Sequence, residues 1–282
     1  MKVADAMTPG SELVTVSLPG SRDDVLEYLQ ERKFSSVPVL GEGGGYRGLV
    51  SRDHLIEHPN EDDLALVMRE VSTTTPDATL EEVAELMRST ESRRIPVVEE
   101  QNGKSLAGII TITDIVRTIA RGNIEADVDV RDLCRDDINA TYEGTPLPVA
   151  EREIGLANVP YTIVLDDKGE MSGMLTEVDI VAVARVVEGE EDAGAAMAGD
   201  DEDWKWESIQ SVGNRYIPTR NVEFPVEPVS TFMTENVVTI SGRKTAQDAA
   251  KLMLSNDIEQ LPVLGGGELA GVVRDSHLLE AV

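Results

Sequence analysis

The chain has 282 residues, of which 41% are hydrophobic, enough for one large domain or two smaller ones with a buried core. Its formal net charge is −28, from 53 acidic and 25 basic residues, which disfavours binding to nucleic acids and to anionic membrane surfaces. No apolar run approaches the roughly 20 residues of a membrane-spanning helix, and the first ten residues are not expected to be a signal peptide. The single cysteine, Cys134, excludes an intrachain disulfide, so a cytoplasmic location is expected.

The excess of acidic residues allows two interpretations. It is either spread over the whole surface, as an adaptation to a salt-rich cytoplasm, or concentrated in one acidic segment at 188–203. Acidic residues recur in every other part of the chain, which favours the first interpretation.

Four repeats of similar length follow one another along the chain. Each begins with a short stretch that contains Met or Cys followed by Thr or Arg, and each later has a glycine followed by two apolar residues. In every repeat the sulfur-containing residue and the glycine are 38 to 41 positions apart. The four pairs are Met7 and Gly48, Met68 and Gly108, Cys134 and Gly173, and Met233 and Gly271.

Within each repeat the residue pattern predicts elements in the order β-α-β-β-α. A short β-prone piece comes first, and then a helix whose apolar residues recur at helical spacing, as they do from Leu80 to Met87. An apolar-Pro-Val strand, a polar turn, the glycine strand and a last helix complete the unit. In the second repeat the last helix has an apolar stripe at Ile112, Ile115, Val116 and Ile119.

The third repeat is the least regular of the four. Ile163 stands where the other repeats have a proline, and residues 143–155 give a poor helical stripe. An insert at 188–226 then separates the third repeat from the fourth. Its first half is acidic and poor in core-forming residues, which predicts mobility, and its second half is expected to pack on the rest of the chain through residues such as Phe224.

These repeats resemble the cystathionine-beta-synthase (CBS) domain. The resemblance rests on the turn that contains "DAMT", the apolar-Pro-Val strand and the Gly-x-x-Thr-x-x-Asp junction at 108–114. It implies an α+β fold in which β-α-β-β-α repeats pair about a pseudo-twofold axis into two Bateman modules. The first module would comprise residues 1–122, with repeats 1–60 and 61–122. The second would comprise residues 123–282, with repeats 123–187 and 227–282 and the acidic insert 188–226.

The resemblance also implies a function. CBS domains commonly bind adenosine-containing ligands in the clefts between paired repeats, so we expect a non-catalytic regulatory protein that binds AMP, ADP or ATP and carries no covalent cofactor. The alternatives are an S-adenosylmethionine sensor and a ligand-free interaction scaffold with Trp204 and Trp206 in its docking element. The resemblance allows a homodimer and a regulated protein partner.

An enzyme is not expected from the sequence. The three histidines, His54, His58 and His277, are not accompanied by a set of acids that would make a metal site or a catalytic triad. The sequence also has no glycine-rich phosphate loop of the Walker or dinucleotide-binding type.

Thr111 and Asp114 allow two roles in the second repeat. As a capping box, the Thr111 hydroxyl would accept a hydrogen bond from the Asp114 N–H at the start of a helix. As a ligand site, Thr111 would donate to a phosphate at the helix N-terminus, and Asp114 would accept from the ribose hydroxyls. Thr176 and Asp179 are the same pair in the third repeat.

The resemblance assigns further ligand contacts in the second repeat. Thr74 would line the base, Ile95 and Pro96 would cover its flat face, and Arg94 or its neighbour Arg93 would reach a phosphate. Surface pairing of these arginines with nearby glutamates is the alternative.

The third and fourth repeats give weaker expectations. Tyr161 is either a core residue or a stacking partner for a base, and Arg274 would reach a phosphate bound mainly by the third repeat. His54 and His277 replace the aspartate in the first and fourth repeats. Because a neutral histidine can accept only one hydroxyl, no ribose site of this kind is expected in those two repeats.

Overall fold

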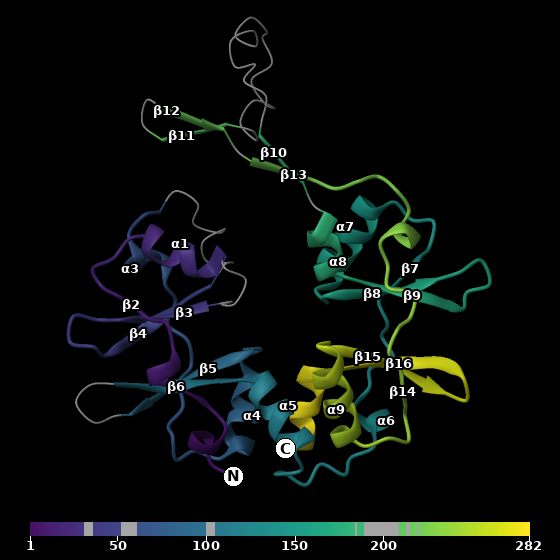
Figure 1. The fold of residues 1–282 in the computed structure, drawn as a ribbon, viewed down its shortest axis with the longest axis horizontal. Coiled ribbons are helices and arrows are strands. Elements are labelled where there is room, and N and C mark those ends of the chain that lie inside the picture. The colour runs from purple at the N-terminus through teal and green to yellow at the C-terminus, as the bar shows by residue number, and fades with distance from the viewer. Residues whose placement is uncertain are drawn as a thin grey trace, which may run out of the picture. The chain divides into compact units, whose positions relative to one another are not determined.

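The structure is a computed structural model that describes residues 1–30, 36–51, 61–99, 105–183, 185–188, 209–212, 215–218 and 220–282. It divides into two compact units, Met1–Arg135 with Thr239–Val282, and Asp136–Val238 (Figure 1). His54, His58, Trp204 and Trp206 lie outside the described residues.

The first unit contains the first, second and fourth repeats, each built on a small sheet. Its strands are β1 (Thr8–Pro9), β2 (Val16–Ser17), β3 (Ser36–Leu40), β4 (Tyr46–Ser51), β5 (Arg94–Glu99), β6 (Ser105–Thr111), β14 (Ile240–Ser241), β15 (Gln260–Gly265) and β16 (Glu268–Arg274). Its α-helices are α1 (Asp23–Gln30), α3 (Leu64–Val67), α4 (Leu80–Ser89), α5 (Ile112–Ala120), α6 (Val130–Leu133) and α9 (Ala246–Asn256). Its 3-10 helices are η1 (Val3–Asp5), η2 (Gly10–Glu12) and η5 (Asp275–Ala281).

The second unit contains the third repeat. Its repeat elements are β7 (Ala140–Tyr142), α7 (Leu147–Ala157), β8 (Tyr161–Leu165), β9 (Met171–Thr176) and α8 (Glu177–Val183), and η4 (Val229–Thr231) follows later in the chain. Around the insert, β10 (Arg185–Glu188) pairs antiparallel with β13 (Arg220–Glu223), and β11 (Ile209–Val212) pairs antiparallel with β12 (Arg215–Pro218). Phe224 packs at the edge of the core of this unit, as expected.

The helix predicted in the third repeat forms, although residues 143–155 give a poor helical stripe. The structure has an eleven-residue helix, α7, whose buried residues Leu147, Ala150 and Ile154 lie on one face. The proline in its first turn suits a helix start, because the N–H that proline lacks has no partner within the helix at that position. The two prolines that interrupt the pattern therefore mark where the helix begins.

The same strand arrangement recurs in all four repeats. In each one, a short strand or a single bridge pairs in parallel with the middle strand, which pairs antiparallel with the glycine strand. The glycines at 48, 108, 173 and 271 lie opposite Val39, Val97, Val164 and Val263. The third repeat thus has the topology of the others, although Ile163 occupies its proline position.

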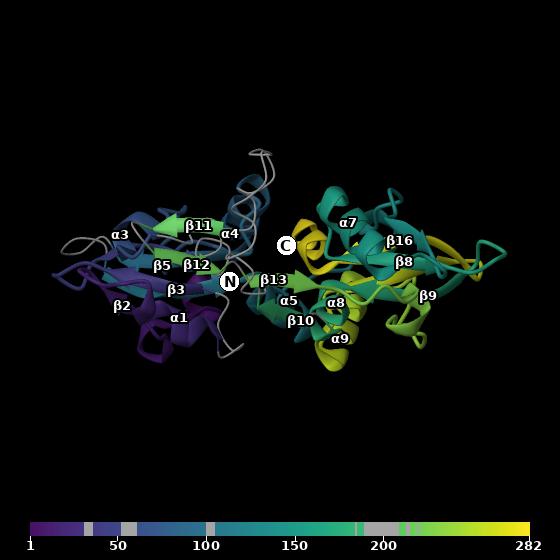
Figure 2. The same ribbon diagram turned by 90° about the horizontal axis from the view of Figure 1, so that it is seen from above.

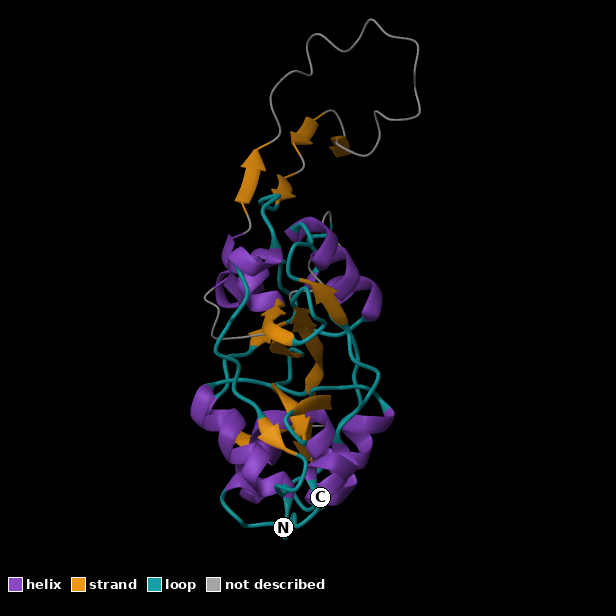
Figure 3. Cartoon of the chain, turned by 90° about the vertical axis from the view of Figure 1, so that its right-hand side faces the viewer, coloured by secondary structure: helices purple, strands orange, loops and turns teal. Residues whose placement is uncertain are grey.

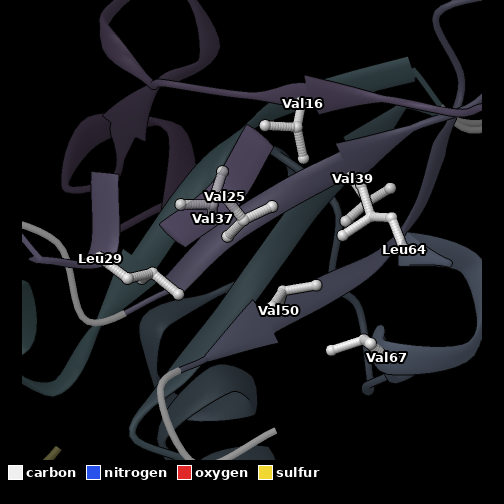
Figure 4. Close-up of a cluster of buried hydrophobic side chains, with 8 residues drawn as sticks. All are labelled: Val16, Val25, Leu29, Val37, Val39, Val50, Leu64 and Val67. Carbon is white, nitrogen blue, oxygen red and sulfur yellow. The ribbon is translucent and has the colours of Figure 1, made fainter. Parts of the chain in front are cut away.

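Each repeat buries the side chains that the periodicity selected. In the second repeat the four apolar residues of α4 and the stripe of α5 are all buried. In the first repeat, α1 and the second repeat's α3 pack with aliphatic side chains of the sheet in one cluster, and Figure 2 shows α1 against β3. The cluster, shown in Figure 4, consists of Val16, Val25, Leu29, Val37, Val39, Val50, Leu64 and Val67.

A seven-residue segment at the start of each repeat, which we call its arm, packs on another repeat. The arms are Lys2–Thr8, Asp63–Arg69, Asp129–Arg135 and Pro228–Thr234. The first residue of each arm forms a bridge at the start of the other repeat's first helix, at Thr79, Ser21, Thr245 and Pro146 respectively. The last residue pairs beside that repeat's glycine, with Ile109, Leu49, Val272 and Met174 respectively. The first and second repeats therefore exchange arms, and so do the third and fourth.

The glycine strands accept the arms because glycine has no side chain. A Cβ on Gly48 would lie 2.6 Å from the carbonyl oxygen of Arg69, and one on Gly173 would lie 3.0 Å from that of Thr234. The first distance is shorter than real Cβ atoms allow and the second is tighter than most Cβ contacts, so a larger residue would press on the arm. The same close approach recurs at the other two glycines, Gly108 and Gly271.

The two compact units differ from the predicted modules 1–122 and 123–282. The fourth repeat belongs to the first unit, where α9 and η5 pack against α4 and α5 of the second repeat. As a result, the two chain termini lie near each other in this unit (Figure 3). The pairing of repeats into Bateman modules therefore stays a prediction.

We expect the variant Gly48→Ala to lower the free energy of unfolding by about 1–3 kcal/mol, because the added methyl group overlaps the backbone of the arm. Thermal unfolding followed by circular dichroism measures the effect. Gly43→Ala is the matched control, since Gly43 lies in the same hairpin and an added Cβ there has no neighbour within 4 Å. Equal midpoints for the two variants would contradict the steric explanation.

Candidate ligand site

A cavity of about 260 Å³ opens in the first unit between the first and second repeats. Its apolar wall comes from Leu13, Val14, Pro38, Ile109 and Ile112. Its polar lining consists of Ser36, Arg93, Arg94, Thr111, Thr113 and Glu259. A wall that combines an apolar part with convergent polar groups is compatible with a small-molecule site, although the volume is just below the usual range of roughly 300–1,000 Å³.

Thr111 and Asp114 form the capping box that the sequence predicted. Thr111 is the N-cap of α5, and its hydroxyl oxygen accepts from the Asp114 N–H at 3.3 Å. The Asp114 carboxylate accepts from the N–H and the hydroxyl of Thr111 at 2.9 and 2.7 Å, and from Arg117 at 2.7 Å. Because the hydroxyl proton already points to Asp114, Thr111 offers the cavity a lone pair and not a proton.

The structure brings some of the predicted contacts of the second repeat together. Thr111 and Arg94 both line the cavity and lie opposite each other on β6 and β5. The Thr74 N–H donates to the carbonyl of Pro96, so Thr74 lies beside the strand that contains Ile95 and Pro96. Ile95 and Pro96 are buried, and of the predicted set only Thr111 and Arg94 are among the described residues that line the cavity.

Repeat one supplies apolar lining that the sequence did not indicate. Pro38 occupies the same strand position in the first repeat as Pro96 in the second, and it lies on the cavity wall with Val14 and Leu13. The apolar-Pro-Val pattern predicts the strand in each repeat, but it does not indicate which of these strands lines the cavity.

Arg93 forms ion pairs with the fourth repeat. Its two terminal nitrogens donate to the two carboxylate oxygens of Asp275 at 3.2 and 2.6 Å, and one of them lies 3.0 Å from Glu259. Burial lowers the pKa of Arg93, but the hydrogen bonds and charges of Asp275 and Glu259 outweigh it and leave that pKa raised. Arg93 therefore pairs with two carboxylates that lie far along the chain.

His277 takes the place of the aspartate in the fourth repeat. Its Nδ1 accepts from the Arg274 N–H at 3.2 Å, at the start of η5. Burial, together with repulsion from Arg135 and Arg274, lowers the pKa of His277 from 6.5 to about 4. A neutral imidazole with one nitrogen already used fits the expectation that this repeat does not bind ribose through an aspartate.

The third repeat contains a second copy of the Thr-x-x-Asp arrangement. The Asp179 carboxylate accepts from the N–H and the hydroxyl of Thr176 at 2.9 and 2.7 Å. Tyr161 lies opposite Thr176 on the neighbouring strand and is 4% exposed, which makes it a core residue in this structure. Arg274 belongs to the first unit and Thr176 to the second, so the expected joint site stays a prediction.

Comparison with known families identifies the repeats. A profile of the CBS domain matches residues 3–61, 63–121 and 229–282, which are the first, second and fourth repeats. The chain belongs to the CBS domain family. The three ranges that match the CBS profile make up more than half of the chain.

Individual relatives agree with this assignment. The uncharacterized protein MJ1404 of Methanocaldococcus jannaschii is 26% identical over 284 residues, which cover 99% of this chain and 61% of that protein. This chain therefore spans about three fifths of the length of that relative. An uncharacterized conserved protein from Pyrococcus horikoshii has a similar crystal structure, with a TM-score of 0.71, 24% identity and 100% of both chains covered. The crystal structure of MJ1225 from Methanocaldococcus jannaschii has a TM-score of 0.65 at 17% identity, with 99% of both chains covered. These two structural likenesses show the fold alone.

Within the described residues, no helix is both long and apolar enough to cross a lipid bilayer. The same part of the chain contains no group of three or more His, Cys, Asp or Glu side chains that could bind a metal ion.

The low pKa of His277 predicts a pH-dependent loss of stability. Below pH 6.5 the histidine of the unfolded chain takes up a proton that the folded protein does not bind until about pH 4, so stability falls as the pH is lowered through this window. His277→Asn keeps an acceptor for the Arg274 N–H and does not titrate. We expect the thermal midpoint of this variant to fall less between pH 7 and pH 5 than that of the unmodified protein. His58→Asn is the control, and parallel curves for all three proteins would contradict the assignment.

Proposed function

We propose that this chain is a non-catalytic regulatory protein that binds an adenosine-containing ligand, AMP, ADP or ATP, in the cavity between its first and second repeats. The observation that carries the proposal is the joint lining of one cavity by Thr111, Arg94 and the first turn of α5 on one side and Pro38 and Val14 on the other. The cavity combines an apolar wall suited to a purine base with polar groups suited to a ribose and an anion.

The geometry suggests how each part of the ligand would be bound. Thr111 and Asp114 present acceptors, which match the donor hydroxyls of a ribose. Arg94 and the first turn of α5, where N–H groups have no partner within the helix, suit a phosphate. This assignment differs from the expectation that Thr111 would donate to phosphate, because its proton is already used.

The exchanged arms support the proposed pairing of repeats into two Bateman modules. Each arm is hydrogen-bonded through its last residue to the glycine strand of its partner, as between Arg69 and Leu49 at 2.9 Å in both directions. The third and fourth repeats exchange arms through the corresponding residues. This supports the proposal that the third repeat, residues 123–187, is also a CBS domain. Thr176 and Asp179 would then contribute to a second site in the third repeat.

One observation favours a ligand-free scaffold as the second candidate. Thr111, Asp114 and Arg93 all have protein partners in this structure, so none of them requires a ligand to satisfy it. S-adenosylmethionine remains an alternative ligand for the same cavity, since it shares the adenosine group with the nucleotides.

Calorimetric titration of AMP, ATP and S-adenosylmethionine tests the proposal, with the protein in potassium chloride to screen its acidic surface. We expect saturable binding of at least one of them, weakened about tenfold or more in Asp114→Asn. That variant keeps an oxygen that can accept from the Thr111 N–H but lacks the negative charge.

Asp248→Asn is the matched control for this experiment. Asp248 has the same capping-box position in α9, where its N–H donates to Thr245 at 3.2 Å, and Thr245, unlike Thr111, is not among the described residues that line the cavity. Folded protein that gives no heat with any of the three ligands would favour the scaffold. An equal loss of affinity in both variants would show that Asp114 acts only through helix stability.

A further inference from the structure

Glu259 is a residue of the fourth repeat that lies on the wall of a cavity built mainly by the first two repeats. It immediately precedes β15, and its carbonyl oxygen accepts from the Asp275 N–H at 2.8 Å. This bond joins the start of β15 to the start of η5. The fourth repeat thereby places the carboxylates of Asp275 and Glu259 beside Arg93, and of these two only Glu259 is among the described residues that line the cavity.

Asp275 alone provides Arg93 with a complete partner. Its side chain is 6% exposed and accepts from both terminal nitrogens of the guanidinium, an arrangement that is strong because two charged hydrogen bonds form in parallel. Glu259 adds a third contact to a cation that is already neutralised. The side chain of Glu259 is 58% exposed, whereas that of Asp275 is 6% exposed.

Arg93, Asp275 and Glu259 together have a net charge of −1 beside the cavity, because one guanidinium faces two carboxylates. A ligand with several negative charges would face the carboxylate of Glu259 as well as Arg94. The charge of Glu259 and the charges of a bound ligand would interact appreciably, because salt screens a half-buried site less than an open surface.

We propose that the carboxylate of Glu259 makes this cavity select ligands by their charge. Adenosine ligands with few negative charges are then preferred over polyphosphates. This inference rests on the proposed function, because it concerns the same cavity. When a more highly charged ligand binds, the Glu259 carboxylate has to move away from Arg93. The fourth repeat then becomes a specificity-determining part of a site that the first two repeats form.

Affinities for adenosine, AMP and magnesium-free ATP in the full chain test the inference. In the unmodified protein we expect ATP to bind more weakly than AMP. In Glu259→Gln, which keeps the size of the side chain and removes its charge, we expect the ratio of ATP affinity to adenosine affinity to rise by about three- to tenfold. Raising the salt concentration should reduce this change.

Glu268→Gln is the matched control. Glu268 is an exposed residue at the opposite end of the β15–β16 hairpin, so its replacement changes the net charge by the same amount away from the cavity. Thermal unfolding of both variants shows that they are folded. If the ligands bind but the ratio is the same in both variants, the inference is overturned while the proposed function stands. If no adenosine ligand binds to the unmodified protein or to Glu259→Gln, both are overturned.

Discussion

The close approach of a backbone arm to a glycine strand is the contact on which the arrangement of repeats depends. At Gly48 there is space for the carbonyl of Arg69 only because no Cβ is present. The reciprocal hydrogen bonds between Arg69 and Leu49 then fix the register of the arm on the sheet. The second arm and the first are held in the same way, so the two repeats are joined at both sheets. The loop residues Leu13 and Val14, which follow the first arm, reach the cavity as a consequence.

A second set of contacts joins the repeats through their helices. In the first unit α9 and η5 pack on α4 and α5, and the buried carboxylate of Asp275 is paired with Arg93 beside the cavity. Removal of one partner from such a pair leaves an uncompensated charge, which is far more costly than loss of an exposed ion pair. A ligand that draws on Arg93 would therefore act on the packing between the second and fourth repeats. This gives the proposed site a physical route by which binding could change the rest of the unit.

Local patterns in the sequence predicted much of this fold. The stripes of α4 and α5, the capping box of Thr111 and Asp114 and the four glycine strands follow from spacing within short segments, where periodicity and capping chemistry act directly. The exchange of arms could not be predicted from such patterns, because it pairs residues of different repeats. Arg93 and Asp275 are 182 positions apart, and no local signal relates them. The helix α7 was underestimated because its prolines interrupt the apolar pattern at the first turn.

The central claim is that the ligand site is made jointly by the first and second repeats. Hydrogen–deuterium exchange of the full chain, with and without saturating AMP, tests it most directly. The account predicts slower exchange of backbone amides in both partners, at residues 10–18 and 36–40 of the first repeat and 93–113 of the second. Protection confined to one repeat, or located only in the second unit, would contradict the claim.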